Sequence, residues 1–186
     1  MLLDDARNIL IRLITELSIS CERLEIAGGV RRGKPDVHDL ELVAIPKVIE
    51  VADLFGNPAR EYSLLDAELA RLDLRQVKGG AKYKQFALPE GISLDLFITT
   101  PDQWGWIFML RTGSADFNRW LVTPRRYGGA LPGHIKCRDG WLWNGPNRIK
   151  TPDELDVFRL LDVAWLEPRD RDAIGKAQGL WRRGTV

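Results

Sequence analysis

The alternation of apolar and polar residues divides the first half of the chain into short helices and strands. Apolar residues recur at helical spacing through residues 2–17 and 62–72, so both segments are expected to be amphipathic helices. Four short runs rich in branched residues are expected to be strands: residues 24–30, 38–45, 83–88 and 92–98. Pro89-Glu90-Gly91 separates the last two runs and predicts a hairpin. This order of elements predicts a mixed sheet with helices on one side.

The second half of the chain has a more helical and less regular pattern. Three helices are expected in it: residues 103–110, 114–120 and 153–163. Ser114 is a good capping residue for the second of them. Residues 127–150 are rich in Gly, Pro and Trp, which is typical of turns and short strands. We therefore expect an α/β (α+β) chain of two subdomains, residues 1–102 and residues 103–186, with the boundary near 99–104.

Three carboxylates interrupt the apolar pattern of the expected strands. Asp39 and Glu41 occupy alternate positions, so both side chains point to one face while the leucines beside them point to the core. Asp95 interrupts the run 92–98, where burial beside apolar neighbours is costly without a charged partner. Like charges at this spacing repel unless a cation lies between them, so the pattern predicts a site for divalent metal ions. The alternative is that the three carboxylates line a solvated face of the sheet.

A glycine pair with basic residues beside it follows the first expected strand. Gly28 and Gly29 end that strand, and Arg31, Arg32 and Lys34 come directly after them. Exposed backbone N–H groups next to positive side chains are typical of a phosphate-binding loop. A phosphate-binding loop next to metal-binding carboxylates indicates nucleotidyl transfer. The simpler explanation of the two arginines is that they are ordinary turn charges.

Composition excludes several classes of protein. With 45% hydrophobic and 28% charged residues, the 186-residue chain is typical of a soluble globular protein. No apolar run is long enough to span a membrane, so no membrane partner is expected. Asp4 and Asp5 near the start argue against a secretion signal. Cys21 and Cys137 stand alone without a Cys/His cluster, which favours a cytoplasmic protein without zinc or disulfides.

Charge is unevenly distributed, although the net charge is only +1. Residues 1–102 have 13 Lys and Arg against 17 Asp and Glu, whereas residues 103–186 have 14 against 9 and contain all seven tryptophans. An acidic half with metal ligands and a basic, aromatic half fit a division between catalysis and polyanion binding. The alternative is that the tryptophans belong to the core and the arginines keep the surface soluble.

Residues 28–42, together with Asp95, resemble the active-site motif of the polymerase beta-like nucleotidyltransferase superfamily, and more narrowly that of the family X DNA polymerases. Thr112-Gly113-Ser114 followed by Phe117-Asn118 is similar to the nucleotide-pocket motif of that family. Glu167-Pro168-Arg169-Asp170-Arg171 is similar to its C-terminal end. The resemblance covers nearly the whole chain.

The resemblance implies a nucleotidyltransferase palm with a mixed sheet and a small C-terminal α+β subdomain. Asp39, Glu41 and Asp95 would be catalytic and would hold two Mg²⁺ ions, which Mn²⁺ can replace. The residues implied to bind a nucleoside triphosphate are Gly28, Gly29, Arg32, His38, Arg111, Thr112, Gly113 and Asn118. Those implied to contact a DNA primer or gapped DNA are Arg31, Lys34 and Lys82. For His38 a structural role is the alternative.

The chain also departs from the family pattern. Leu110 and Arg111 stand where the family usually has a bulky aromatic residue or a Gly-Trp pair that guards the sugar 2′ position, so the choice between dNTP and rNTP stays open. Glu41 replaces the usual second aspartate. Ala115 and Val122 replace polar residues that contact the nucleotide or the template, which predicts low fidelity.

The expected activity is the addition of nucleotides to a DNA 3′ end with release of pyrophosphate, in short-gap filling during DNA repair or end joining. The segment before Cys21 is too short for the N-terminal lyase domain of the family. We therefore expect a minimal, monomeric form without 5′-deoxyribose phosphate lyase activity, in the cytoplasm or with the nucleoid. Two alternatives stay open: transfer to a non-DNA acceptor such as an RNA end, a protein or a small molecule, and a non-catalytic DNA-binding relative.

Overall fold

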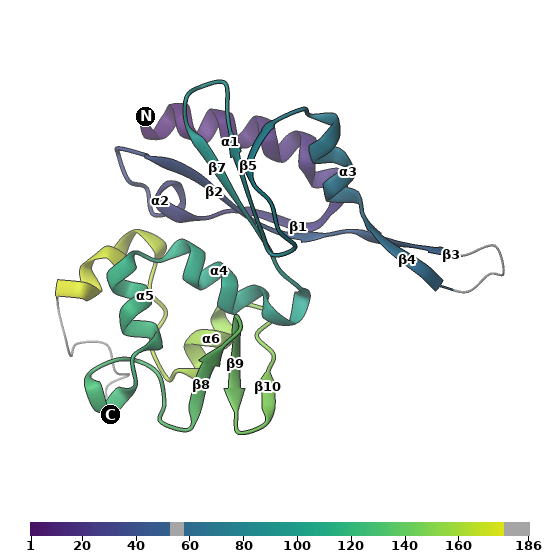
Figure 1. Ribbon diagram of the computed structural model, residues 1–186. Helices are drawn as coiled ribbons and strands as arrows, with labels where there is room; N and C mark the ends of the chain where they lie inside the picture. The colour runs from purple at the N-terminus through teal and green to yellow at the C-terminus, as the bar shows by residue number, and fades with distance from the viewer. Residues whose placement is uncertain (53–57, 177–186) are drawn as a thin grey trace. The chain divides into compact units, whose positions relative to one another are not determined.

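Contacts between residues divide the chain into two units, shown in the computed structural model of Figure 1, which describes residues 1–52 and 58–176. Unit 1 consists of Met1–Ile26 and Pro35–Thr99. Unit 2 consists of Ala27–Lys34 and Thr100–Val186. The main boundary therefore falls between Thr99 and Thr100, and a short stretch after the first strand belongs with the C-terminal half of the chain.

Unit 1 contains a mixed five-stranded sheet, in agreement with the sequence pattern. Its elements are α1 (Leu3–Leu17), η1 (Ser18–Ser20), β1 (Cys21–Ile26), β2 (Asp39–Pro46), β3 (Val48–Ala52), β4 (Pro58–Ser63), α3 (Leu64–Arg71), β5 (Arg75–Lys78), β6 (Tyr83–Ala87) and β7 (Ser93–Ile98). The strand order is β1-β2-β7-β6-β5. β2 and β7 are parallel, and the other neighbouring strands are antiparallel. The predicted hairpin of β6 and β7 is confirmed.

The two faces of this sheet differ in polarity. Leu40, Leu42, Leu94 and Leu96 have no exposed surface and lie on one face of β2 and β7. Helices α1 and α3 cover one face of the sheet (Figure 1), and α1 packs against β1 through its apolar stripe. Each fully buried leucine contributes about 1.5–3 kcal/mol of hydrophobic stabilisation. The alternate positions of the same two strands carry the carboxylates and project to the other face.

Four details of unit 1 differ from the sequence expectation. The first strand ends at Ile26 rather than 30, because Gly28 has a φ of +61°, which interrupts an extended strand. Helix α3 begins at Leu64, after Ser63 accepts a hydrogen bond from the backbone N–H of Asp66. β3 and β4 form a two-stranded ribbon that the periodicity did not predict. β5 was also missed, because all four of its residues are exposed and show no alternation.

Unit 2 combines helices with a three-stranded antiparallel sheet in the order β10-β9-β8. Its elements are α2 (Gly28–Arg31), η2 (Pro101–Gln103), α4 (Trp104–Thr112), α5 (Ala115–Val122), η3 (Arg125–Tyr127), β8 (Ile135–Arg138), β9 (Trp141–Asn144), β10 (Asn147–Ile149), α6 (Glu154–Leu160) and η4 (Pro168–Lys176). The expected helices and short strands are confirmed, although α6 is shorter than 153–163 because Asp162 adopts a φ of +45°.

The core of unit 2 lies between its helices and the inner face of its sheet. Trp106, Met109, Phe117, Leu142 and Phe158 are among its buried side chains. Helices α4 and α6 approach so closely at Gly105 that an added Cβ would lie 2.0 Å from the backbone oxygen of Asp153. A glycine is therefore required at this contact. Within residues 1–52 and 58–176, no helix is both long and apolar enough to cross a membrane.

Candidate active site

The parallel pairing of β2 and β7 brings two of the predicted carboxylates side by side. Glu41 is the register partner of Asp95, and Asp39 is the partner of Ser93. Partners on neighbouring strands point to the same face, and Asp39 lies two residues before Glu41 on that face. Asp39 is exposed, whereas Glu41 and Asp95 are half-buried. The three carboxylates therefore share one face of the sheet of unit 1.

Two neighbours on β6 hold the carboxylate of Asp95. The hydroxyl of Tyr83 donates to Asp95 Oδ1 at 2.9 Å, and Gln85 Nε2 donates to the same oxygen at 2.8 Å. The ring of Tyr83 is stacked on that of Phe97, with centroids 5.3 Å apart. Both of these donors end on Oδ1. Asp95 is therefore oriented by two side chains of the neighbouring strand.

The donor set fits a hard divalent cation chemically. Carboxylate oxygens are the protein ligands that Mg²⁺ prefers, and Glu41 and Asp95 supply two of them from adjacent positions. Among the described residues, however, no three His, Cys, Asp or Glu side chains gather closely enough to hold a metal ion. The register thus supplies a pair of candidate ligands, with Asp39 further along the same face.

In unit 2, Arg31 is bound to the first turn of α6. Its Nη1 and Nη2 donate to the two carboxylate oxygens of Glu154 at 3.0 and 2.7 Å. Nη1 also donates to Thr112 Oγ1 at 2.5 Å, and the guanidinium lies 3.8 Å from the ring centroid of Phe108. Both terminal nitrogens of this side chain therefore donate to residues of unit 2.

A second arginine binds the same carboxylate. Arg171 has no exposed surface, and its Nη1 donates to Glu154 Oε1 at 2.6 Å. Arg171 also donates twice to the backbone oxygen of Leu166. Burial raises the pKa of Glu154, but the hydrogen bonds from Arg31 and Arg171 outweigh it and hold that pKa below its usual value. Glu154 is therefore a buried anion shared by two cations.

Arg32 contacts the Thr-Gly step that the sequence predicted as part of a nucleotide pocket. Its Nη1 donates to the backbone oxygens of Thr112 at 2.5 Å and Gly113 at 3.1 Å. Its Nε lies 3.2 Å from Asp172 Oδ1, and Lys34 Nζ lies 3.6 Å from the other oxygen of the same carboxylate. The carboxylate of Asp172 thus lies close to two of the cations that were predicted to bind phosphate, where a phosphate group would otherwise be expected.

The remaining predicted residues are distributed as follows. In unit 1, His38 is exposed just before β2, and Lys82 is exposed just before β6. In unit 2, Gly28 and Gly29 form the first half of α2, and Arg111 is exposed near the end of α4. Asn118 Nδ2 donates to the backbone oxygen of Leu110 at 2.7 Å. The predicted carboxylates therefore belong to unit 1, and most of the predicted nucleotide-binding residues belong to unit 2.

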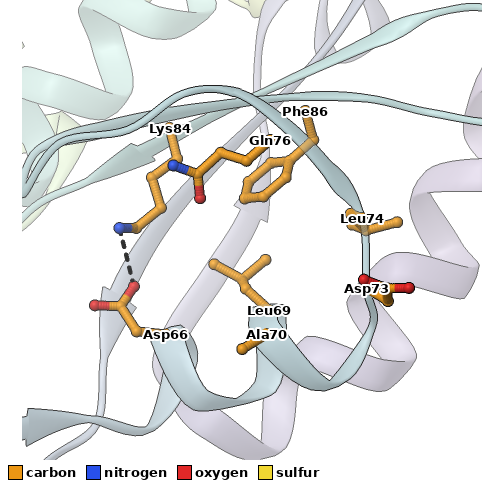
Figure 2. Close-up of a pocket in the computed structure, with 8 residues that line it drawn as sticks. All are labelled: Asp66, Leu69, Ala70, Asp73, Leu74, Gln76, Lys84 and Phe86. Carbon is orange, nitrogen blue, oxygen red and sulfur yellow. Dashed lines mark ion pairs between the residues drawn. The ribbon is translucent and has the colours of Figure 1, made fainter.

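A cavity of about 240 Å³ lies elsewhere in unit 1, between α3 and strands β5 and β6. Figure 2 shows Leu69 and Phe86 pointing toward each other inside it, and Lys84 paired with Asp66 at 3.1 Å. None of the residues predicted from the sequence is among its lining residues.

Four side chains that position the candidate groups were not assigned these roles from the sequence: Tyr83, Gln85, Glu154 and Arg171. The sequence matches no model of a known protein family, and no curated protein is similar to it by sequence comparison. The functional conclusion therefore depends on the residues themselves.

Proposed function

We propose that this chain is a nucleotidyltransferase that adds nucleotides to a DNA 3′ end and releases pyrophosphate, with a polymerase beta-like palm formed by unit 1. The observation that carries the proposal is the pairing of Glu41 with Asp95 in register, with Asp39 on the same face. Two adjacent carboxylates on central strands repel each other, and a bound cation relieves that repulsion. The orientation of Asp95 by Tyr83 and Gln85 supports a positioned ligand rather than a freely solvated side chain.

The reaction joins the primer 3′ oxygen to the α-phosphorus and breaks its bond to the pyrophosphate leaving group. Divalent cations supply charge neutralisation and favour deprotonation of the 3′ hydroxyl. Glu41 and Asp95 would hold these cations, with Asp39 as a further ligand from the same face, and Asp95 would be held in turn by the hydroxyl of Tyr83. Catalysis of this type consists mostly of positioning and electrostatic stabilisation.

Most of the residues that we propose for nucleotide binding belong to unit 2. Arg32 and Lys34 would bind phosphate oxygens in exchange for Asp172, and the Thr112-Gly113 step would lie against the sugar. Arg31 and Glu154 would act as positioning residues, because their mutual hydrogen bonds fix α2 beside α4 and α6. The short-gap role in repair or end joining is the biological setting that we propose for this activity.

The test is extension of a labelled primer on single-stranded, recessed and one-nucleotide-gapped DNA, with dNTPs or rNTPs and with Mg²⁺ or Mn²⁺. Asp95→Asn keeps an oxygen that can accept from Tyr83 and Gln85, so the variant is expected to fold normally. Its extension rate is expected to fall by about 100-fold or more, as with loss of one charge-stabilising group.

The matched control is Asp5→Asn, an exposed carboxylate in the first turn of α1, which is expected to leave the rate unchanged. Normal extension by folded Asp95→Asn would exclude the proposed site. Absence of extension by the natural sequence on every DNA substrate, with metal-dependent nucleotide transfer to RNA or protein, would exclude the DNA acceptor instead.

A further inference from the structure

The three-stranded sheet of unit 2 has one apolar face and one face of aromatic and basic residues. Ile135 and Leu142 are buried in the core of the unit. Side chains alternate along each strand, so the opposite face carries the other set. These residues, which we call the Trp–Arg face, are Lys136 and Arg138 of β8, Trp141 and Trp143 of β9, and Arg148 of β10. The register agrees, because Trp143 pairs with Lys136 and Arg148, and Trp141 pairs with Arg138.

On this face, guanidinium groups and indole rings lie against one another. The Cζ atom of Arg138 lies 4.3 Å from the ring centroid of Trp143. The Cζ atom of Arg148 lies 5.0 Å from the centroid of Trp141 and 5.2 Å from that of Trp143. Trp143 Nε1 also donates to the backbone oxygen of Arg138 at 3.1 Å. These contacts hold the two arginine side chains in place before any ligand binds, which lowers the entropy cost of binding.

The Trp–Arg face has a strong excess of positive charge. Lys136, Arg138 and Arg148 are exposed, and β8, β9 and β10 contain no Asp or Glu. Asp139, in the turn after β8, lies 3.6 Å from Arg138, but both side chains are more than half exposed, so this pair is weak. In the described part of the chain, Lys136 and Arg148 have no carboxylate within ion-pair distance.

A cavity of about 620 Å³ adjoins this face at β8. Its apolar walls include Leu131, Pro132 and Ile135, and its cations are Arg126 and Lys136. No Asp or Glu lines it. Lys136 lines the cavity and also belongs to the Trp–Arg face, whereas Ile135 and Cys137, which line the cavity too, lie on the opposite side of β8. The cavity and the Trp–Arg face therefore meet at the edge strand β8.

We propose that the Trp–Arg face binds single-stranded nucleic acid. Proteins that bind single strands combine positive groups, which follow the phosphates, with planar side chains, on which unstacked bases stack. Guanidinium groups supply both functions, because they bind phosphate and stack on planar rings. A duplex offers its phosphates to such a face, but its bases are already stacked. The apolar cavity beside Lys136 provides room for one base that is turned away from its neighbours.

The inference goes beyond the proposed function, because none of these residues is assigned to catalysis. The binding of single-stranded nucleic acid is measured without nucleotide or metal. A failure of this binding can therefore be distinguished from a failure of the proposed nucleotide transfer. The probe is a fluorescein-labelled oligothymidylate, with oligouridylate as the RNA arm and a hairpin duplex as competitor. Anisotropy titrations at several salt concentrations give both the dissociation constant and its salt dependence.

Arg138→Ala combined with Arg148→Ala is expected to weaken binding about tenfold or more and to reduce the slope of log affinity against log salt by about 1.4. Arg148→Lys keeps the charge, so it should preserve the slope while weakening binding through lost stacking. The matched control is Arg119→Ala with Arg159→Ala, which removes two exposed arginines from α5 and α6. Circular dichroism and thermal unfolding establish that each variant is folded.

Equal weakening by the control pair would show non-specific charge attraction and overturn the proposal. Binding that does not depend on salt, or tighter binding of the duplex, would also overturn the proposal. Unchanged affinity of Arg138→Ala/Arg148→Ala together with reduced thermal stability would overturn it too, because the stacked arginines would then serve only the fold. Preference for oligothymidylate or oligouridylate identifies DNA or RNA as the source. Binding that depends on these arginines in a protein without transferase activity would reject only the proposed reaction.

Discussion

Arg31 and Glu154, which are 123 positions apart in the sequence, meet through two hydrogen bonds of 3.0 and 2.7 Å, one to each carboxylate oxygen. The Glu154 side chain is only 5% exposed, and Arg171 donates to the same carboxylate. Planar guanidinium and carboxylate groups bind strongly in this two-point geometry. The interaction joins the first segment of unit 2 to its last.

Glu154→Gln is expected to destabilise the protein by about 3–5 kcal/mol, because it leaves the buried guanidinium of Arg171 and the partly buried guanidinium of Arg31 without their counter-charge. The free energy of unfolding in urea measures this directly. The matched control is Glu167→Gln, an exposed residue that accepts from Trp165, for which a change within about 0.5 kcal/mol is expected. Equal stability of the two variants would mean that the buried ion pairs contribute nothing.

The same carboxylate predicts a pH dependence of stability. Burial raises the pKa of Glu154, but the hydrogen bonds from Arg31 and Arg171 outweigh it, so the folded pKa lies below the ordinary value of 4.5. Its stabilising contribution is therefore complete above 4.5 and is lost as the pH falls through the folded pKa. The difference in unfolding free energy between the natural sequence and Glu154→Gln should be constant near neutral pH and should narrow in acid. A difference in unfolding free energy that widens in acid would contradict the lowered pKa of Glu154.

Thr112→Val is expected to cost about 1.5–3 kcal/mol, because the fully buried hydroxyl accepts a hydrogen bond from the charged group of Arg31. Thr112→Ser keeps that acceptor and serves as the control. It is expected to lose less stability than Thr112→Val, because only one methyl group is removed. Chemical denaturation measures both variants. If serine and valine were equally destabilising, the loss would come from packing rather than from the hydrogen bond.

Tyr83→Phe removes one of the two donors to Asp95 while keeping the ring that stacks on Phe97. Under the proposed function, kcat/KM for primer extension is expected to fall about tenfold, the value of one charge-assisted hydrogen bond. The Mg²⁺ concentration for half-maximal rate should also rise, which a merely structural role would not cause. Tyr62→Phe on β4 is the control. An unchanged metal dependence would show that Tyr83 does not position the carboxylate for catalysis.

Asp172→Asn removes the anion that lies beside Arg32 and Lys34. If these cations bind a triphosphate, the variant should bind nucleoside triphosphate more tightly, by up to about fivefold, since a partly exposed ion pair is worth up to about 1 kcal/mol. Calorimetric titration with a non-hydrolysable nucleotide measures the affinity, with Asp170→Asn as the control. Weaker binding by Asp172→Asn would mean that the carboxylate supports the site rather than competing for it.

The sequence predicted those parts of unit 1 in which local pattern and sheet geometry agree. The alternation of Asp39 and Glu41 with leucines placed both carboxylates on one face, and the hairpin between β6 and β7 was correct. The position of Gln85 opposite Asp95 could also have been derived, because a turn centred on Glu90 pairs these two residues. The sequence could therefore have predicted a neighbour of Asp95 on β6 as well as the shared face of the three carboxylates.

Contacts between distant segments were not predictable from local pattern. Arg171 lies among five other charged residues or prolines at 167–172, a composition typical of an exposed segment, yet it is completely buried. Its partner Glu154 has the appearance of an ordinary acidic residue in the first turn of a helix. β5 was missed because all four of its residues are exposed, so it lacks the one-sided apolar pattern that identifies a strand. Val48, Ile49 and Val51 of β3 are exposed as well.

The two stretches of unit 2 have a consequence for the order in which the protein can fold. Residues 27–34 leave the ribosome long before Glu154 and Arg171 are synthesised. During synthesis, α2 therefore lacks its partners while the strands that follow it in the sequence are completed. A polypeptide expressed from Thr100 onward would contain the carboxylate and Arg171 but not Arg31. Dividing the gene between Thr99 and Thr100 would therefore give two incomplete fragments. The N-terminal fragment would contain Arg31 and Arg32 without their partners, and the C-terminal fragment would lack the first segment of unit 2.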